Sequence, residues 1–365
     1  MVNSVKSLLW AARLFGGTPF KITRHNVSIS TVGIIHAAIA SMTLLFIGLT
    51  QVYLDDIGTI DKKTLVLAVL RTIFTYICIV ADVVFTIIKY EDLKSAIDHI
   101  HVYDVAAKFN NKYNNLTLIH CRIVGLIALC FWLPVTYLAY KVENNYPLLE
   151  TITYILFYGT ITSQTLLFYG FMMTLYRRFN HLSELVVKKE WMMEMKIQTL
   201  SGTWDGLKLQ NVWLMHSNLS TAAEKINNCY SVQLLLWIFS SSMSVLTRLY
   251  TMMNFKENFE YITPRDTFCA LGVFFNLILI IFSCHITSRR ANRIADKVFS
   301  PNSTIHRQPN TIEGNKTASI YFCIRKIRFS AASGFIHIHL PLLLSIVGAM
   351  TTYLVILSKS SSKDA

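Results

Sequence analysis

Two arginines stand inside long apolar stretches of the sequence, where a charged side chain is costly and therefore marks a candidate functional position. Arg71 lies within Thr64–Ile88 and Arg248 lies within Tyr230–Met252. Aromatic side chains lie in the first of these stretches and in two further ones: Tyr76, Trp132, Tyr137, Tyr154 and Tyr158. Aromatic walls with a few polar groups suit a small polar ligand. Tyr and Trp also gather at membrane surfaces without touching a ligand, so both interpretations stay open.

Other chemistries have little support in the sequence. His337 and His339 form a His-x-His pair, but no further Cys, His or carboxylate lies close to them, so we expect no metal site and no cofactor. The seven cysteines show no metal-like spacing. Nucleotide-binding loops, catalytic triads and zinc signatures are not recognisable, so we do not expect an enzyme.

The apolar stretches themselves predict the fold. Of the 365 residues, 53% are hydrophobic and 15% are charged, whereas a soluble chain carries about 25% charged residues. A transmembrane helix needs about 20 apolar residues. We therefore predict an all-α membrane protein with seven spanning helices: Thr31–Tyr53, Thr64–Ile88, Ile123–Tyr140, Thr151–Tyr176, Tyr230–Met252, Thr267–Thr287 and Leu340–Leu357.

Basic residues predict the orientation of these spans. The N-terminal segment and the second, fourth and sixth loops hold 24 Lys and Arg, against seven in the other loops and the C-terminal tail. By the positive-inside rule the N-terminus is cytoplasmic and the C-terminus is extracellular. This is the reverse of a G-protein-coupled receptor. The +13 net charge is thus explained by orientation, and we expect no nucleic-acid partner.

A helical stripe of apolar residues lies between the fourth and fifth spans. Its members are spaced three or four residues apart, as on one face of a helix: Val212, Met215, Leu219, Ala222, Ala223 and Ile226. We expect the helices of spans four and five to continue below the membrane and pack together there. A helix lying on the membrane surface is the alternative.

Three stretches resemble the insect gustatory receptor family. The first is FSAASGFIHIHLPLLLSIVGAMTTYLVIL, residues 329–357, which is similar to the family's C-terminal block with its Thr-Tyr followed by apolar residues. The second is LMHSNLSTAAEKINNCYSVQLLL, residues 214–236, which resembles a His-containing inner helix leading into span five. The third is RRFNHLSEL, residues 177–185, which looks like the basic exit from span four.

This resemblance implies a ligand-gated, non-selective cation channel in the plasma membrane of chemosensory neurons. It implies a homo- or heterotetramer embedded in lipid, with the last span of each subunit lining a central pore and a tastant pocket opening outward within spans one to six. The pore and gate candidates are then Thr352, Tyr353, Val355, Ile356 and Lys359. Apolar residues near the outer end of such a span can gate by dewetting.

The resemblance and the span prediction together divide the chain. We expect a cytoplasmic N-terminal segment (1–30), spans one to four (31–176), a cytoplasmic helical extension (177–229) and spans five and six (230–287). A cytoplasmic loop with an anchor helix (288–339), the pore-lining helix (340–357) and an extracellular tail (358–365) complete it. The long cytoplasmic extensions form the expected anchor domain.

Lys359 is where the resemblance fails. The family carries Gln at the position aligned with Lys359 and Phe at the position aligned with Ser360. In a tetramer Lys359 would place four positive charges near the outer mouth of the pore. Three interpretations are open: the helix ends early and the lysine points outward, the ending SKSSSKDA is not native, or the chain needs a partner subunit to conduct.

Two alternative functions also stay open. An insect odorant receptor subunit shares the inverted seven-span plan and works with an obligate co-receptor. A secondary transporter would show internal repeats and broken helices at the midplane, which this sequence lacks. Which tastant binds is not legible, because sugars, polyols and bitter compounds all suit an aromatic and polar pocket.

Overall fold

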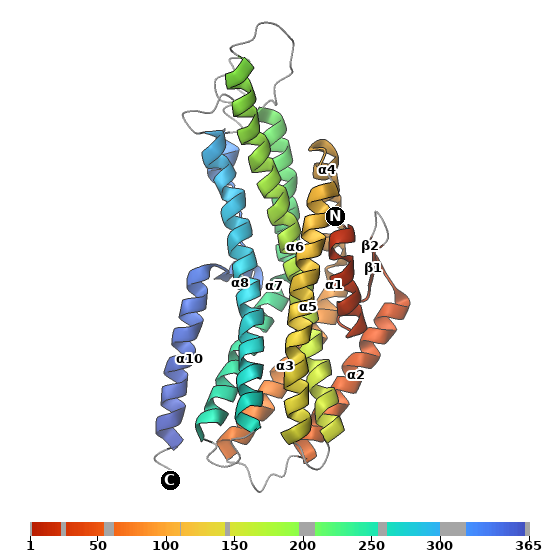
Figure 1. Cartoon of the computed structure of the whole chain (residues 1–365), viewed down its shortest axis with the longest axis vertical. Helices are drawn as coiled ribbons and strands as arrows, with labels where there is room; N and C mark the ends of the chain where they lie inside the picture. The colour runs from red at the N-terminus through yellow and green to blue at the C-terminus, as the bar shows by residue number, and fades with distance from the viewer. Residues whose placement is uncertain are drawn as a thin grey trace.

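The structure, a computed structural model, describes residues 2–22, 27–54, 62–109, 111–142, 147–196, 209–254, 261–299 and 319–361. Residues 362–365 of the expected tail, and parts of the expected segments 177–229 and 288–339, lie outside the described residues. The described chain forms an elongated bundle that is almost entirely helical (Figure 1). The prediction of an all-α protein is confirmed.

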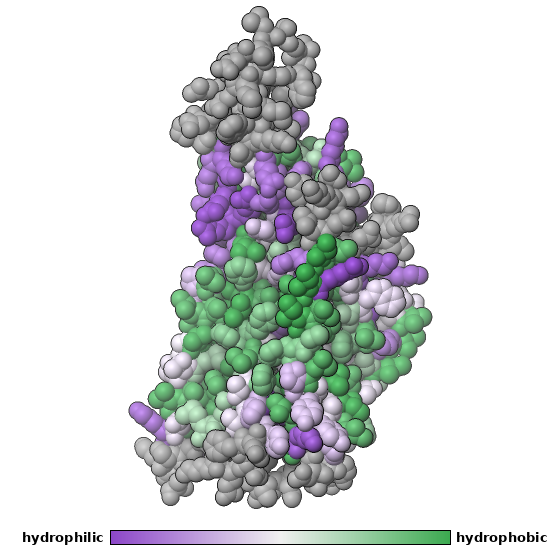
Figure 2. All heavy atoms as spheres, in the orientation of Figure 1, coloured by the Kyte–Doolittle hydropathy of each residue, from purple (hydrophilic) through white to green (hydrophobic). Residues whose placement is uncertain are grey.

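Seven long helices correspond to the seven predicted spans, and successive ones alternate in direction (Figure 1). They are α2 (Thr31–Leu54), α3 (Lys62–Ile88), α5 (Asn111–Val142), α6 (Pro147–Lys196), α7 (Leu209–Asn254), α8 (Ile262–Val298) and α10 (Leu340–Ser361). On the face that Figure 2 shows, hydrophobic side chains form a broad band across the bundle, and hydrophilic side chains gather toward one end. We call that end, where α6, α7 and α8 reach furthest, the long-helix end, and the opposite end the short-loop end.

Among the described residues, six helices are long and apolar enough to cross a membrane, and α6 is not one of them. The centre of α6 is less apolar because it carries a row of buried hydroxyl and amide side chains: Thr160, Thr162, Ser163, Gln164 and Thr165. The helix contacts α1, α5, α7 and α8, so protein covers most of its surface. Polar side chains are tolerated inside a membrane bundle where they face other helices.

Three helices extend well beyond the thickness of a bilayer. α6 has 50 residues, α7 has 46 and α8 has 37, whereas about 20 residues suffice to cross the hydrocarbon core. The predicted apolar stripe from Val212 to Ile226 lies on α7, and all six of its members are buried. The prediction that spans four and five continue as packed helices is confirmed.

One helix that the sequence analysis did not anticipate, α4 (Tyr90–Ala106), follows α3 directly. It was not predicted because α4 is too short and too charged to be a span, and only its buried face is apolar: Leu93, Ala96, Ile97, Ile100 and Tyr103. It packs mainly against α7, and side chains near its C-terminal end also bind α6. Arg178 of α6 binds Asp104 of α4 through two hydrogen bonds of 2.7 and 2.6 Å. The hydroxyl of Tyr103 donates to the carbonyl oxygen of Arg178 at 3.1 Å. This clamp fixes α4 against the long-helix end of α6.

The N-terminal segment packs into the bundle. Helix α1 (Val2–Leu14) precedes an antiparallel hairpin of β1 (Phe20–Ile22) and β2 (Val27–Ile29). Leu8 of α1 reaches α5 and α6 at two glycines. A Cβ added to Gly170 would come 2.8 Å from the Cδ1 atom of Leu8, and one added to Gly125 would come 3.1 Å from its Cδ2 atom. Because these two glycines have no side chains, α1 can pack closely against α5 and α6.

The link between α8 and α10 is fastened to α7. It contains β3 (Ser330–Ala331), the short helix η2 (Ala332–Gly334) and β4 (Ile336–His337). The backbone N–H of Ser330 donates to Asn227 at 2.9 Å, and that of Ser333 donates to Ser231 at 2.6 Å. Beyond this link α10 stands at the side of the bundle (Figure 1). No residue from Leu340 to Lys359 is buried.

Candidate ligand-binding site

A buried ion pair joins α7 to α8 near the short-loop end. The antiparallel arrangement of these two helices brings Arg248 beside Asp266, and a guanidinium N–H of Arg248 donates to the Asp266 carboxylate. Both side chains are buried. A second N–H of Arg248 donates to the hydroxyl of Tyr158 on α6. A buried charge is tolerated only when it is paired and hydrogen-bonded, and both conditions are met here.

A second arginine extends this pair into a network. The guanidinium of Arg265 donates to Glu150 at 2.9 Å and to Asp266 at 3.2 Å. Glu150 stands in the first turn of α6, so the network ties together the ends of α6, α7 and α8. The two positive and two negative groups, Arg248, Arg265, Asp266 and Glu150, balance one another. We call these four residues and the aromatic and polar side chains that contact them the Arg248 cluster.

Aromatic rings cover the network from one side. Trp132 of α5 stacks on Tyr158 with ring centroids 4.5 Å apart, and Tyr154 lies 5.5 Å from Tyr158. The guanidinium carbon of Arg248 is 5.7 Å from the Tyr154 ring and 5.6 Å from the Tyr158 ring. Cations at this distance are attracted by the ring quadrupole. Four of the seven predicted ligand residues, Trp132, Tyr154, Tyr158 and Arg248, thus lie in one cluster.

Two polar side chains, Thr162 and Asn276, lie next to the aromatic rings. The indole N–H of Trp132 donates to the hydroxyl of Thr162 at 3.0 Å, and the amide of Asn276 donates to the same oxygen at 2.9 Å. The Nε of Arg248 is among the buried polar atoms of the cluster that have no hydrogen-bond partner in the described part of the chain. An unsatisfied buried donor is costly. A bound ligand with an acceptor group would satisfy it.

The three other predicted ligand residues lie differently. Arg71 on α3 is partly buried and acts electrostatically on Asp266, which places it beside the cluster. Tyr76, five residues further along α3, is also partly buried. Tyr137 is 60% exposed, and the ammonium of Lys141 lies 5.9 Å from its ring centroid. Tyr137 therefore faces away from the bundle.

Five residues of the cluster were missed by the sequence analysis: Glu150, Thr162, Arg265, Asp266 and Asn276. Glu150, Arg265 and Asp266 lie next to the ends of the predicted spans. Charged residues are common there and do not indicate a binding site. Thr162 and Asn276 are polar residues inside spans, and a systematic search for buried polar side chains at matching depths would have found them.

The residues predicted for the pore and gate lie in the exposed C-terminal part of α10, where they point to several sides of the helix. The side chains of Tyr353, Val355 and Ile356 are 60%, 49% and 57% exposed, and Thr352 and Lys359 are exposed as well. The preceding part of the same helix meets the bundle through partly buried Leu342, Leu343, Ile346 and Met350. The hydroxyl of Thr352 donates to its own helix, at the carbonyl of Gly348, at 3.0 Å.

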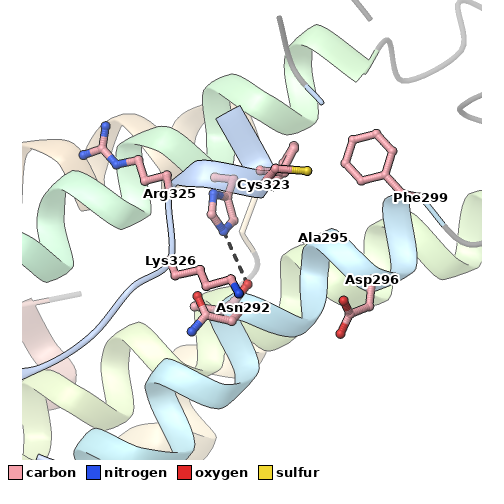
Figure 3. Close-up of a pocket in the computed structure, with 10 residues that line it drawn as sticks. Asn292, Ala295, Asp296, Phe299, Cys323, Arg325 and Lys326 are labelled. Carbon is pink, nitrogen blue, oxygen red and sulfur yellow. Dashed lines mark hydrogen bonds between the residues drawn. The ribbon is translucent and has the colours of Figure 1, made fainter. Parts of the chain in front are cut away.

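A separate cavity lies near the long-helix end, between α8 and residues 322–326. Its volume is about 620 Å³. Asn292, Ala295, Asp296 and Phe299 follow one side of α8 and its C-terminal end, and Cys323, Arg325 and Lys326 lie across from them, with the Arg325 side chain turned away from α8 (Figure 3). His216 of α7 forms part of its wall.

His216 is held in a hydrogen-bonded network in the part of α7 that precedes the predicted span Tyr230–Met252. Its Nε2 lies 3.4 Å from the carbonyl oxygen of Ala291, and its Nδ1 lies 3.2 Å from the hydroxyls of Tyr321 and Ser220. Burial lowers the pKa of His216 to about 4, so the imidazole is neutral at pH 7. The residue joins α7, α8 and residues 319–324.

Comparison with known proteins extends over nearly the whole chain. The family model of the 7tm chemosensory receptors matches residues 5–358. The solved structure of the insect olfactory receptor OR5 from Machilis hrabei in complex with eugenol matches with a TM-score of 0.70 and 14% identity, covering 98% of this chain and 97% of that one. The OR5 structure without eugenol gives a TM-score of 0.71, 15% identity and 97% coverage of both chains. No curated protein matches significantly. These likenesses confirm the predicted seven-span fold.

Proposed function

The chain belongs to the chemosensory receptor family that includes the insect gustatory and olfactory receptors, and on that premise we propose that it is a gustatory receptor acting as a tastant-gated, non-selective cation channel. The channel opens when a small molecule binds near the Arg248 cluster. It works in the plasma membrane of chemosensory neurons. It assembles as a tetramer, alone or with related subunits.

The observation that carries this proposal is the exposure of α10. The helix is apolar enough to span a membrane, yet none of its residues from Leu340 to Lys359 is buried by its own chain. Gly348 faces open space, since a Cβ added to it would meet no atom within 4 Å. A large exposed apolar surface marks an interface with lipid or with other chains. Four copies of α10 around one axis would cover it and leave a central pore.

The orientation of α10 in this assembly follows from its two faces. Leu342, Ile346 and Met350 face the subunit's own bundle, so the exposed side with Thr352 and Ile356 is free to face the axis. Val355 and Ile356 then form the apolar constriction, and Lys359 lies at the outer mouth. The basic residues of the long-helix end support a cytoplasmic location for that end.

The charge balance of the Arg248 cluster supports a neutral ligand. In the buried centre of the cluster, Arg248 and Arg265 are already neutralised by Asp266 and Glu150, so a charged ligand there would leave one unpaired charge buried. Arg71 lies beside this centre and is only partly buried. Hydroxyl groups can meet the unsatisfied Nε of Arg248, and a ring can pack on the aromatic side chains. Sugars, polyols and hydroxylated bitter compounds fit this description.

The test is to express the chain alone and record cation current while a tastant panel is applied. We expect current in response to at least one neutral hydroxylated compound. Removing the hydroxyl with Tyr158→Phe should raise the half-maximal concentration about tenfold, which corresponds to about 1.4 kcal/mol for one hydrogen bond to a charged group. Tyr137→Phe is the matched control, because that exposed tyrosine faces away from the cluster. A receptor that responds to tastants equally well after either change would rule out this ligand site.

An olfactory receptor subunit is the second candidate, and the overall likeness to OR5 is the observation in its favour. Such a subunit would give no current alone and would respond to volatile compounds once a co-receptor is present. The same recordings, repeated with an added co-receptor and a panel of odorants, separate the two functions.

A further inference from the structure

The cavity near the long-helix end has two walls that are fixed to each other at both ends. At one end the side-chain amide of Asn292 on α8 donates to the carbonyl oxygen of Ile327 at 3.0 Å and accepts from its backbone N–H at 2.9 Å. At the other end the rings of Phe299 and Phe322 meet edge to face, with centroids 5.8 Å apart. The cavity of about 620 Å³ between these contacts is therefore preformed. Its volume lies in the range of about 300–1,000 Å³ that is usual for small-molecule sites.

Part of the cavity lining is apolar and aromatic. Ala291 and Ala295 of α8 supply methyl groups, and Phe299 and Phe322 supply rings. The imidazole of His216 lies against this part, with its centroid 4.9 Å from that of Phe322. Because burial lowers the pKa of His216 to about 4, the ring is uncharged at pH 7. An aromatic side chain of a ligand can therefore pack here without meeting a charge.

The charged residues of the lining differ in whether they already have a partner. The guanidinium of Arg325 binds Glu224 at 2.7 Å, and its side chain is turned away from α8 (Figure 3). Asp296 and Lys326 form no ion pair with each other or with any other residue in the part of the chain that the structure describes. Both side chains are exposed, and they lie on opposite walls. A ligand that carries one positive and one negative group would pair with both.

The spacing of these two charges indicates the size of such a ligand. The Lys326 side chain extends toward α8 near Asn292, and Asp296 lies one helical turn further along α8 (Figure 3). Four residues of an α-helix span about 6 Å. The two ends of an extended dipeptide are about 7 Å apart, because each residue spans roughly 3.3–3.6 Å. A dipeptide is therefore long enough to reach both charges.

From these features we propose that the cavity binds a zwitterionic dipeptide whose first residue is aromatic. Its carboxylate pairs with Lys326, its ammonium group pairs with Asp296, and its ring packs against Phe299 and Phe322. The bound peptide joins α8 to residues 322–326, which continue through the link into α10. The site lies at the opposite end of the bundle from the Arg248 cluster, and its test requires no recording of current.

Cys323 provides the readout, because its exposed thiol lines the cavity. The purified full-length receptor is treated with N-ethylmaleimide with and without phenylalanyl-glycine, and modification of Cys323 is followed by mass spectrometry. We expect a saturating concentration of the dipeptide to slow this modification at least threefold. A Cys323 that does not react in the absence of the dipeptide, or that reacts equally fast in its presence, would overturn the proposal.

Two modified dipeptides test the charges of the ligand. N-acetyl-phenylalanyl-glycine lacks the ammonium group, and phenylalanyl-glycinamide lacks the carboxylate. Each should require about a fivefold higher concentration for half of the protection, a modest factor because Asp296 and Lys326 are exposed to solvent. Equal protection by all three compounds would overturn the assignment of a zwitterion.

Two variants of the receptor assign each charge to its partner. In Asp296→Asn, acetylating the dipeptide should no longer weaken protection, and in Lys326→Gln, amidating it should no longer do so. Both side chains are exposed, so these changes should not disturb folding. Arg328→Gln removes a positive charge from an exposed residue of the same segment that does not line the cavity, and it should keep both preferences. Preferences that persist unchanged in Asp296→Asn and Lys326→Gln would overturn the proposal.

Discussion

Helices α7 and α10 both cross the hydrophobic band of the molecule, but they meet opposite surroundings. α7 carries buried polar side chains along one face, including Gln233, Ser240 and Arg248, and each is covered by neighbouring helices of the same chain. α10 is more uniformly apolar, and its own chain buries none of its residues from Leu340 to Lys359.

The difference shows that hydropathy and burial report separate properties. An apolar sequence indicates that a helix is removed from water, but it does not indicate what covers the helix. In α7 the polar side chains are tolerated because they face other helices of the same chain, which supply partners such as Asp266 and Tyr158 to Arg248. In α10 apolar residues stay exposed within one subunit, so the covering must come from lipid or from other subunits.

Arg248→Ala gives the largest expected effect on the α7 side of the comparison. It leaves Asp266 buried without its main partner, and breaking a buried pair costs about 3–5 kcal/mol of unfolding free energy. Chemical denaturation of the purified receptor measures this loss. Arg293→Ala on the exposed surface of α8 should cost far less. Equal stabilities for these two variants would mean that the ion pair contributes nothing to the fold.

Two isoleucine substitutions, one in a buried helix and one in α10, compare the effect of burial on stability. Ile281 of α8 is fully buried and Ile356 of α10 is 57% exposed. Ile281→Ala should lower the unfolding free energy by about 2–5 kcal/mol, because it leaves a cavity. Ile356→Ala should change the unfolding free energy by less than about 1 kcal/mol, because few contacts are lost, while altering the current. The comparison between α7 and α10 fails if Ile356→Ala destabilises a single subunit as strongly.

From the lowered pKa of His216 we predict how the unfolding free energy at the long-helix end depends on pH. Its folded pKa of about 4 is lower than the ordinary value near 6.5, so the unfolded chain binds a proton first as the pH falls. The contribution of the neutral imidazole to the unfolding free energy is therefore complete above about pH 6.5 and is lost progressively toward pH 4. The loss is about 2 kcal/mol at pH 5. His216→Gln removes the titration, and its melting temperature should fall less between pH 7 and pH 5 than that of the unchanged receptor.

Lys359→Gln gives the smallest effect and tests the outward face of α10. Four lysines around a pore would repel a passing cation by about 3 kcal/mol at a distance near 5 Å, and salt reduces this value. We expect about a tenfold larger cation current, which corresponds to about 1.4 kcal/mol. Lys141→Gln, on a different helix at the same end, is the control. An unchanged current after Lys359→Gln would mean that this lysine points away from the permeation path.

The sequence predicted the seven spans because each must present about 20 apolar residues to lipid or to neighbouring helices. It failed at α4, which is too short and too charged to be a span and whose packing depends on Arg178 from a distant helix. It also gave no sign that α1 packs into the bundle, because that packing depends on glycines more than 100 residues away.

The candidate site was predicted only in part, for a related reason. Arg248 attracted notice as a charge inside a span, and Trp132 and Tyr158 as aromatic residues at a similar depth. Asp266 did not, because a carboxylate at a helix end is unremarkable until the neighbouring helix is placed beside it. The type of a residue and its place in a span can mark it as a candidate site residue. Its partner, however, depends on how helices far apart in the sequence align.

The contacts of α1 with two later helices also set an order of events during synthesis. Leu8 leaves the ribosome well before its two glycine contacts, Gly125 and Gly170. At about 5–20 residues per second the interval is roughly 10–30 s. Throughout that time the apolar face of α1 has no docking place in its own chain. Helix α1 is therefore made before the helices that hold it and reaches its final position only after they are made.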